Sequence, residues 1–175
     1  MDRNEVIVPE APQGPKDVTS HLLGVHLSVP RAAHDCPGIK LLGRTVRSLV
    51  FSTDLVVIRN CDADAVLAVY PFTCQPAITQ ALVSTAGRPV LTGVAGSTTS
   101  GARSVLLAME SETQGVSGVV LNYGATPELV ASIAQTVDVP VVVTITDWDD
   151  LAREKVAAGA LVLNVAAGSH TPQVV

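Results

Sequence analysis

Short apolar runs alternate with segments of helical periodicity along most of the chain. Nearly continuous runs of Val, Leu and Ala are typical of parallel strands, because helices cover both faces of a parallel sheet. The predicted strands lie at 65–70, 89–93, 118–122, 139–144 and 161–165. Segments with helical spacing and helix-end residues separate them, at about 75–86, 101–114, 126–137 and 148–158.

The helix expected after Thr126 is the best-marked element. Thr126 can cap it, Pro127 suits the first helical position, and Glu128 complements the positive end of the helix dipole. Apolar residues then recur at helical spacing as far as Val137. This segment therefore predicts one helix between two strands.

The regular order of strands and helices predicts the fold class. Tandem βα units with right-handed crossovers form a closed barrel or a doubly wound sheet. A barrel is favoured because every predicted strand ends in a small or polar residue and no long switch-point connection is present. Eight units of about 25 residues need about 200 residues, and the sequence has 175. We therefore expect an α/β protein with an incomplete or truncated (β/α) TIM-type barrel.

The first third of the sequence is harder to interpret. Residues 1–37 are expected to form an extended arm with a possible strand at 22–28, and residues 38–175 to form the barrel-like domain. Gly38–Phe51 has helical spacing, whereas Leu55–Ile58 resembles a strand. A parallel crossover needs about a dozen residues, more than separate Leu55–Ile58 from the strand at 65–70. The two segments form a hairpin, or one of them is not a barrel strand.

An open barrel would leave two strand edges and apolar flanks uncovered, which favours pairing with another chain. We therefore expect self-association, or covering of the edges by residues 1–37.

Composition narrows the class of protein. Apolar residues make up 47% of the chain and charged residues 15%, which excludes general disorder. No apolar run approaches the roughly 20 residues of a membrane-spanning helix, and the first residues do not resemble a signal peptide. The net charge of −5 and the pI of about 5.2 argue against nucleic acid as a partner. Three cysteines without CxxC spacing predict neither a disulfide framework nor a zinc site, so a cytoplasmic location is expected.

Polar residues at the predicted strand ends are the candidate site, because barrel chemistry collects at the carboxyl ends of the strands. The candidate catalytic residues are Asp64, Tyr70, Asn122 and Asn164. Asp62 and Asp64 could serve as a paired carboxylate site, or as loop and capping carboxylates. Asp64 precedes its strand, which conflicts with a place at the carboxyl end.

A Gly- and hydroxyl-rich loop follows the strand at 89–93. Gly93, Gly96 and Ser97 are candidate anion-binding residues, because backbone N–H groups and a helix dipole can hold phosphate or carboxylate. Ala102 and Arg103 stand where a P-loop requires Lys and Ser or Thr, so the loop is not a P-loop. Lys155 lies within a predicted helix and is expected to be solvated, or to lay its stem on apolar surface with the amine in water. No metal site is expected.

The run from Ser52 to Phe72 resembles a group of little-characterised bacterial β/α (TIM)-barrel proteins that are often labelled only as hydrolases. Thr19 to His26, Thr144 after its apolar run, and Ala160 to Val165 also match. The resemblance implies a barrel fold and a chain that is truncated at its C-terminal end.

Two functions remain open. One is a β/α-barrel hydrolase, lyase or isomerase that acts on a small phosphorylated or carboxylated metabolite and forms a homo-oligomer. The other is a ligand-binding or self-assembling barrel without catalysis.

Overall fold

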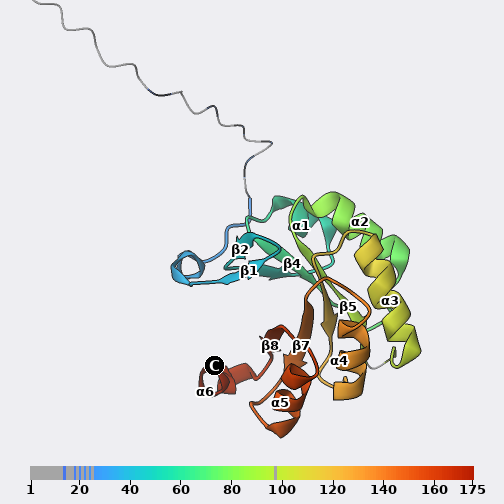
Figure 1. Ribbon diagram of the computed structural model, residues 1–175. Helices are drawn as coiled ribbons and strands as arrows, with labels where there is room; N and C mark the ends of the chain where they lie inside the picture. Colours follow the sequence, from blue (N-terminus) through green and yellow to red (C-terminus); the bar gives the residue numbers. More distant parts are fainter. Residues whose placement is uncertain are drawn as a thin grey trace, which may run out of the picture.

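A parallel sheet of six strands organises the protein in the computed structural model, which describes residues 14, 18, 20, 22, 24, 26–96 and 98–175 (Figure 1). The strands lie side by side in chain order, from β3 to β8. Their bounds are β3 (Leu49–Phe51), β4 (Ala65–Ala68), β5 (Val90–Ala95), β6 (Gly118–Leu121), β7 (Val141–Ile145) and β8 (Val162–Val165). The five predicted strands are confirmed, and the curled α/β sheet is part of a β/α barrel.

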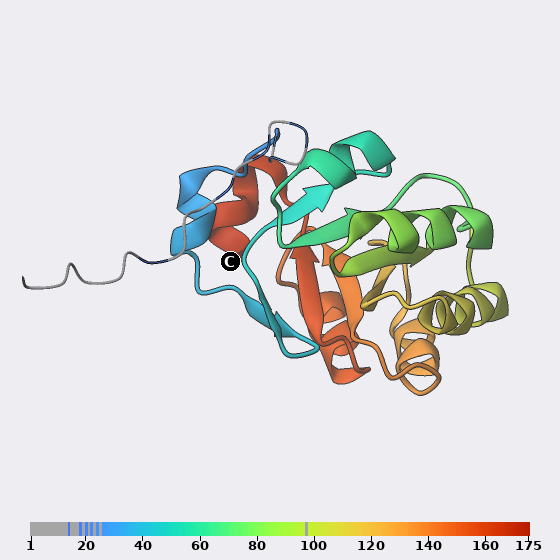
Figure 2. The ribbon, with the colours of Figure 1, turned by 90° about the horizontal axis from the view of Figure 1, so that it is seen from above.

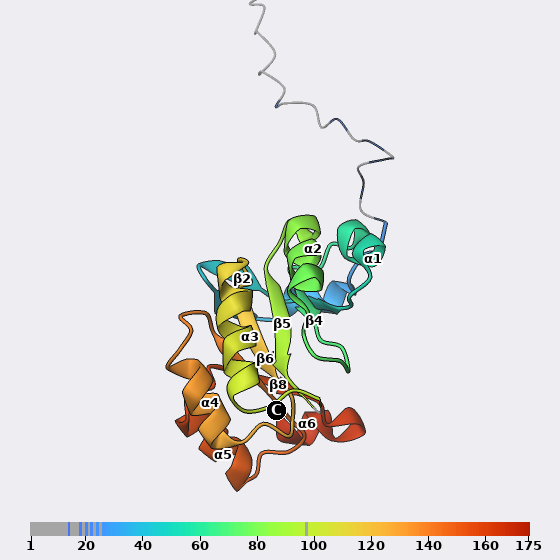
Figure 3. The same cartoon turned by 90° about the vertical axis from the view of Figure 1, so that its right-hand side faces the viewer.

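Helices follow the strands and form an arc along one face of the sheet, as the side view shows (Figure 3). They are α1 (Leu55–Asn60), α2 (Pro76–Ala86), α3 (Ala102–Thr113), α4 (Pro127–Ala134) and α5 (Asp150–Ala157). Shorter helical segments are η1 (Arg31–Asp35), η2 (Gly168–His170) and α6 (Thr171–Val174). The predicted cap of α4 is confirmed, since the Leu129 N–H donates to Thr126 Oγ1 at 3.3 Å. In the described residues, no helix is long and apolar enough to cross a membrane.

The helix expected over Gly38–Phe51 is wrong. This segment forms the antiparallel hairpin of β1 (Ile39–Leu41) and β2 (Arg44–Val46), followed by β3. The turn residues Leu42 and Gly43 have φ values of 47° and 82°, and positive φ at both positions is typical of a two-residue hairpin turn. Three short strands and their turns place apolar residues at a spacing that imitates a helix.

The strand-like segment Leu55–Ile58 is helical, because it lies within α1. Asp54 Oδ1 accepts the N–H groups of Val56 and Val57 at 2.8 and 3.2 Å, and this cap starts the helix despite the β-branched residues that follow. Of the two alternatives for this segment, the second therefore holds: Leu55–Ile58 is not a barrel strand. α1 is the crossover between the parallel strands β3 and β4.

Most of the expected arm at 1–37 lies outside the described residues, as do parts of the possible strand at 22–28. Leu27 forms an isolated parallel bridge with Cys61.

The hairpin covers the face of the sheet opposite the helices, which we call the inner face (Figure 2). Leu41 and Val46 are 1% and 2% exposed, and they pack against inner side chains near the amino ends of the strands. These inner side chains are Ala65, Leu91, Val120 and Val142. A Cβ on Gly118 would lie 3.2 Å from Leu91 Cδ2, so this glycine makes room for Leu91.

Replacing Leu41 with Ala should lower the free energy of unfolding by about 2–5 kcal/mol, because the change leaves a cavity in the core. Chemical denaturation measures the difference. Leu42→Ala is the matched control, since Leu42 is 62% exposed and its loss should cost less than about 0.5 kcal/mol. Equal losses for the two variants would show that the hairpin does not cover the inner face.

Candidate functional site

A row of polar side chains lies at the carboxyl ends of β6, β7 and β8. Thr144 pairs with Asn164 in the register of β7 and β8, and Asn164 Nδ2 donates to Thr144 Oγ1 at 3.1 Å. Leu121 pairs with Val143, so Asn122 lies beside Thr144. Side chains alternate between the two faces of a strand. Each member of this row is two residues after an apolar side chain of the inner face, so the row lies on that face, nearer the carboxyl ends of the strands. The structure brings the predicted residues Asn122 and Asn164 to one edge of one face.

Tyr70 lies at the same edge of the sheet, beyond the end of β4. It lines a cavity of about 100 Å³ that the segments after β4, β5 and β6 enclose. Asn122 borders this cavity and also an adjoining one of about 330 Å³, which extends toward the start of α4. Tyr70 and Asn122 thus face a common hollow at the carboxyl edge.

The phenol of Tyr70 keeps its proton at neutral pH. Its oxygen accepts the Gln75 N–H at 2.9 Å, and the Cys74 side chain lies beside the hydroxyl. Burial is the main cause that raises the pKa of Tyr70 above its usual value of 10.0, and the neighbouring Cys74 raises the pKa further. The group therefore remains protonated at neutral pH and can act as an acid or a hydrogen-bond donor, but not as a base.

Three threonine hydroxyls, which are not among the predicted site residues, gather beside Tyr70. Thr99 Oγ1 donates to Thr73 Oγ1 at 2.8 Å, and Thr73 Oγ1 lies 3.5 Å from Thr98 Oγ1. Thr73 follows the strand at 65–70, and the other two lie in the glycine-rich loop after the next strand. Their position directly after a strand could have identified them as candidate site residues. Buried Cys74 places its Sγ 3.2 Å from Thr79 Oγ1.

The glycine-rich loop has a more compact backbone than an open anion cradle. Gly96 and Thr99 exchange two backbone hydrogen bonds of 3.0 and 3.2 Å, which occupy both N–H groups. A Cβ on Gly93 would lie 3.2 Å from Val69 Cγ1, so Gly93 allows β4 and β5 to pack closely. Ser97 lies outside the described residues. The α3 helix that follows begins after Gly101, which provides no side-chain cap to its first N–H groups.

Asp64 lies at the opposite edge of the sheet, before β4. Its Oδ2 accepts the N–H groups of Arg47 and Ser48 at 2.8 and 3.0 Å, and Ser48 Oγ donates at 3.1 Å. Asp62 likewise accepts the Val29 N–H at 2.7 Å. Both carboxylates bind backbone, which fits the loop and capping alternative. Asp64 is not brought together with Tyr70 and Asn122.

Lys155 is buried, and the expectation of a lysine whose amine lies in water is wrong. Its side chain is 1% exposed, and Nζ donates to the Tyr123 carbonyl at 2.6 Å and lies 5.4 Å from the centre of that ring. Burial lowers the pKa of Lys155, although Asp149 opposes the effect. The amine holds the turn that follows Asn122, whose Oδ1 accepts the Tyr123 N–H at 2.8 Å.

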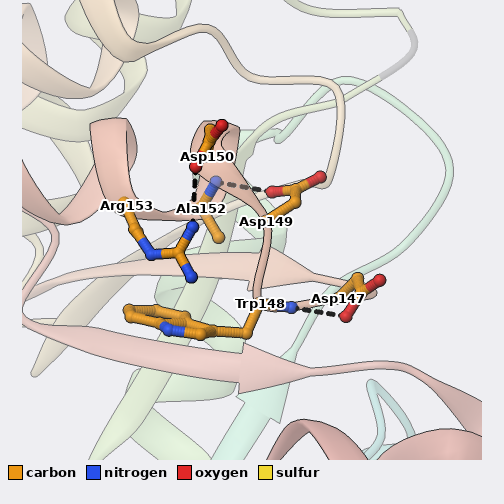
Figure 4. Close-up of polar contacts among 6 residues, drawn as sticks. All are labelled: Asp147, Trp148, Asp149, Asp150, Ala152 and Arg153. Atoms are coloured by element: carbon orange, nitrogen blue, oxygen red, sulfur yellow. Dashed lines mark hydrogen bonds and ion pairs between the residues drawn. The ribbon is translucent and has the colours of Figure 1, made fainter.

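The acidic residues after β7 are engaged in the local structure of that loop (Figure 4). Asp149 caps α5 by accepting the Ala152 N–H at 2.8 Å, and Asp147 accepts the Trp148 N–H at 2.7 Å. Arg153 pairs with Asp150 at 2.7 Å and lies over the Trp148 ring. Across the described ranges, no group of three His, Cys, Asp or Glu side chains could hold a metal ion.

Comparison with solved structures shows the fold. A dihydrodipicolinate synthase superimposes with a TM-score of 0.50 and 11% identity, over 69% of this chain and 58% of that one. The dihydrodipicolinate synthase of Agrobacterium tumefaciens superimposes with a TM-score of 0.46 and 13% identity, over 63% of this chain and 44% of that one. The nitroalkane oxidase of Streptomyces ansochromogenes superimposes with a TM-score of 0.45 and 18% identity, over 62% of this chain and 35% of that one.

The chain spans between 35% and 58% of the length of these three proteins. The dihydrodipicolinate synthase superposition supports a partial TIM-type barrel. No known protein family and no curated protein matches the sequence.

Asp64→Asn should lower the free energy of unfolding by about 1 kcal/mol at pH 7, at the low end for a charged hydrogen bond because the group is exposed. The Arg47 N–H is the main cause that lowers the pKa of Asp64 below its usual 3.8. The stabilisation is therefore present above pH of about 4 and is lost as the pH falls through the lowered pKa.

Urea denaturation at pH 7 and at pH 3 measures this difference. Asp138→Asn is the control, because no hydrogen bond to the Asp138 side chain is found in the part of the chain that the structure describes. A loss that does not depend on pH would exclude the carboxylate as its cause.

Proposed function

We propose that the chain forms the carboxyl-edge site of a β/α-barrel enzyme that acts on a small phosphorylated or carboxylated metabolite. Tyr70 serves as the acid or hydrogen-bond donor, and Asn122 and Asn164 orient the substrate. The reaction is of the hydrolase, lyase or isomerase type, in which proton transfer from a positioned acid assists bond cleavage or rearrangement.

The observation that carries the proposal is the meeting of Tyr70 and Asn122 at one cavity, at the carboxyl edge of a parallel sheet. In β/α barrels this edge holds the active site. The dihydrodipicolinate synthase that shares the fold is named as an enzyme, and we carry over only that general class.

The anionic group of the ligand would lie toward the start of α3. Uncapped N–H groups at a helix start attract phosphate and carboxylate, and the larger cavity reaches Ser100 and Thr99 beside this helix. No Lys, Arg or His lines either cavity among the described residues. Binding would therefore depend on N–H groups, hydroxyls and the Asn122 amide, with Gly93 and Gly96 shaping the loop.

Tyr70→Phe and Asn122→Ala should each weaken binding of the stabilising ligand about tenfold or more, because each removes a hydrogen bond to a charged ligand. The ligand is found by thermal shift with inorganic phosphate, phosphorylated sugars and short carboxylic acids, and its affinity is measured by calorimetry. Tyr123→Phe is the matched control, because Tyr123 borders neither cavity. Failure of every compound to stabilise the protein would overturn the proposal.

Self-association is the second candidate, favoured by the two sheet edges. Parallel strands hydrogen-bond through opposite sides to their two neighbours, and β3 and β8 leave opposite sides unpaired within the described sheet. β8 of one copy can therefore add to β3 of another with all strands parallel. The apolar side chains at these edges are exposed, with Phe51 at 68% and Leu161 at 75%.

Phe51→Lys should convert an associated form into single chains of 18.1 kDa, because a charge on an edge strand opposes pairing. Light scattering coupled to size-exclusion chromatography measures the mass. Leu106→Lys is the control at a similarly exposed position on α3 (61%). A wild-type protein that elutes as a single chain at all concentrations would exclude this second function.

A further inference from the structure

A second concave site lies at the amino edge of the sheet, opposite the row of Asn122, Thr144 and Asn164. Its volume is about 340 Å³. The hairpin turn, the end of α2 and the segments that lead into β5 and β6 enclose it. Its lining residues are Leu41, Leu42, Arg44, Val83, Gly87, Arg88, Pro89 and Ser117. No residue at the carboxyl-edge cavities contributes to this lining.

Arginine side chains gather at this cavity without acidic partners. The side chain of Arg44 makes no hydrogen bond or ion pair with any described residue. Arg88 donates from Nε and Nη1 to the carbonyls of Ala86 and Ala63, which fixes its guanidinium while Nη2 keeps its protons available. Arg59 lies near the lining residue Gly87, with Nη1 3.3 Å from the position that a Cβ on Gly87 would take.

This concentration of positive charge contrasts with the rest of the protein. The chain has a net charge of −5, yet no Asp or Glu lines the cavity. Like charges near one another raise the free energy of the folded state unless a counter-charge is bound. The arrangement therefore favours an anion as the missing partner of Arg44 and Arg88.

The remaining walls of the cavity are apolar. Leu41, Leu42, Val83 and Pro89 form one side, and Ser117 adds a hydroxyl. Leu42 has a φ of 47°, a conformation that non-glycine residues rarely adopt and that Asn or Gly would accept with less strain. The turn nevertheless places a leucine side chain at the cavity, where it can contact the apolar part of a ligand.

We propose that this cavity binds a small molecule that carries a phosphate group on a planar or apolar body. The planar guanidinium of Arg matches the geometry of phosphate oxygens and pairs with them through two hydrogen bonds. Arg44 and Arg88 hold the phosphate, Ser117 donates a further hydrogen bond, and the apolar wall covers the body. The site is independent of the proposed function at the carboxyl edge and would suit an effector.

Calorimetry on the full chain tests the proposal with inorganic phosphate and adenosine monophosphate as probes. Both should bind, and adenosine monophosphate should bind at least tenfold more tightly because its base contacts the apolar wall. Rising salt should weaken both, since the contact is between charges. Absence of binding by either probe would overturn the site. Equal affinity for the two probes would overturn the assignment of the ligand class.

Variants locate the binding. Arg44→Gln should weaken binding of adenosine monophosphate by about tenfold to a hundredfold, because it removes a charged pair. Arg31→Gln, an exposed arginine on η1 outside the cavity, is the matched control. Leu42→Asp adds a negative charge at the cavity on an exposed residue and should weaken binding similarly.

Tyr70→Phe should leave this affinity unchanged, whereas it weakens binding at the carboxyl edge. The melting temperature of each variant shows that it remains folded. Undiminished binding in folded Arg44→Gln and Leu42→Asp proteins would overturn the proposal. Loss of binding in Tyr70→Phe would place the phosphate at the carboxyl edge and would equally overturn it.

Discussion

The protein depends on how the inner face of its curled sheet is filled. A parallel sheet needs apolar cover on both faces, and the outer face obtains it from the helices that follow each strand. The inner face obtains it from Leu41 and Val46 of the hairpin, which pack against Ala65, Leu91, Val120 and Val142. On β6, β7 and β8 the next inward positions, Asn122, Thr144 and Asn164, are polar. The boundary between a filled and an open part of the barrel is therefore the boundary between core and candidate site.

The strands from β4 to β8 could be predicted because each is a mostly apolar run of four to six residues, and a marked helix follows each of them up to β7. The hairpin could not, since three-residue strands carry too little periodicity to be distinguished from one helix. Leu55–Ile58 was misassigned for a different reason. Its β-branched residues favour a strand, but the Asp54 cap and packing against α2 outweigh this preference.

Residues of the candidate site could be predicted only where they end a strand, because the ends of parallel strands lie at one edge of the sheet. Asn122 and Asn164 end strands, so the register brings them to one edge. Tyr70 follows from the same argument. The burial of Lys155 could not be anticipated, because its environment comes from a loop 32 residues away in the sequence. The arginines at 44, 59 and 88 are dispersed along the chain, and only the packing of the hairpin beside the end of α2 brings them near one another.

The two edges of the sheet differ in their electrostatics, and this difference separates their chemistry. At the carboxyl edge the two cavities that Asn122 borders are lined by no cationic side chain among the described residues, and their donors are neutral groups such as the Tyr70 phenol and the Asn122 amide. Neutral donors discriminate by geometry, because a misplaced acceptor leaves them unpaired. At the amino edge the guanidinium groups attract any nearby anion over a longer range. A site that selects by hydrogen-bond geometry suits a specific reaction, whereas a site that selects by charge suits reversible binding of a phosphorylated ligand.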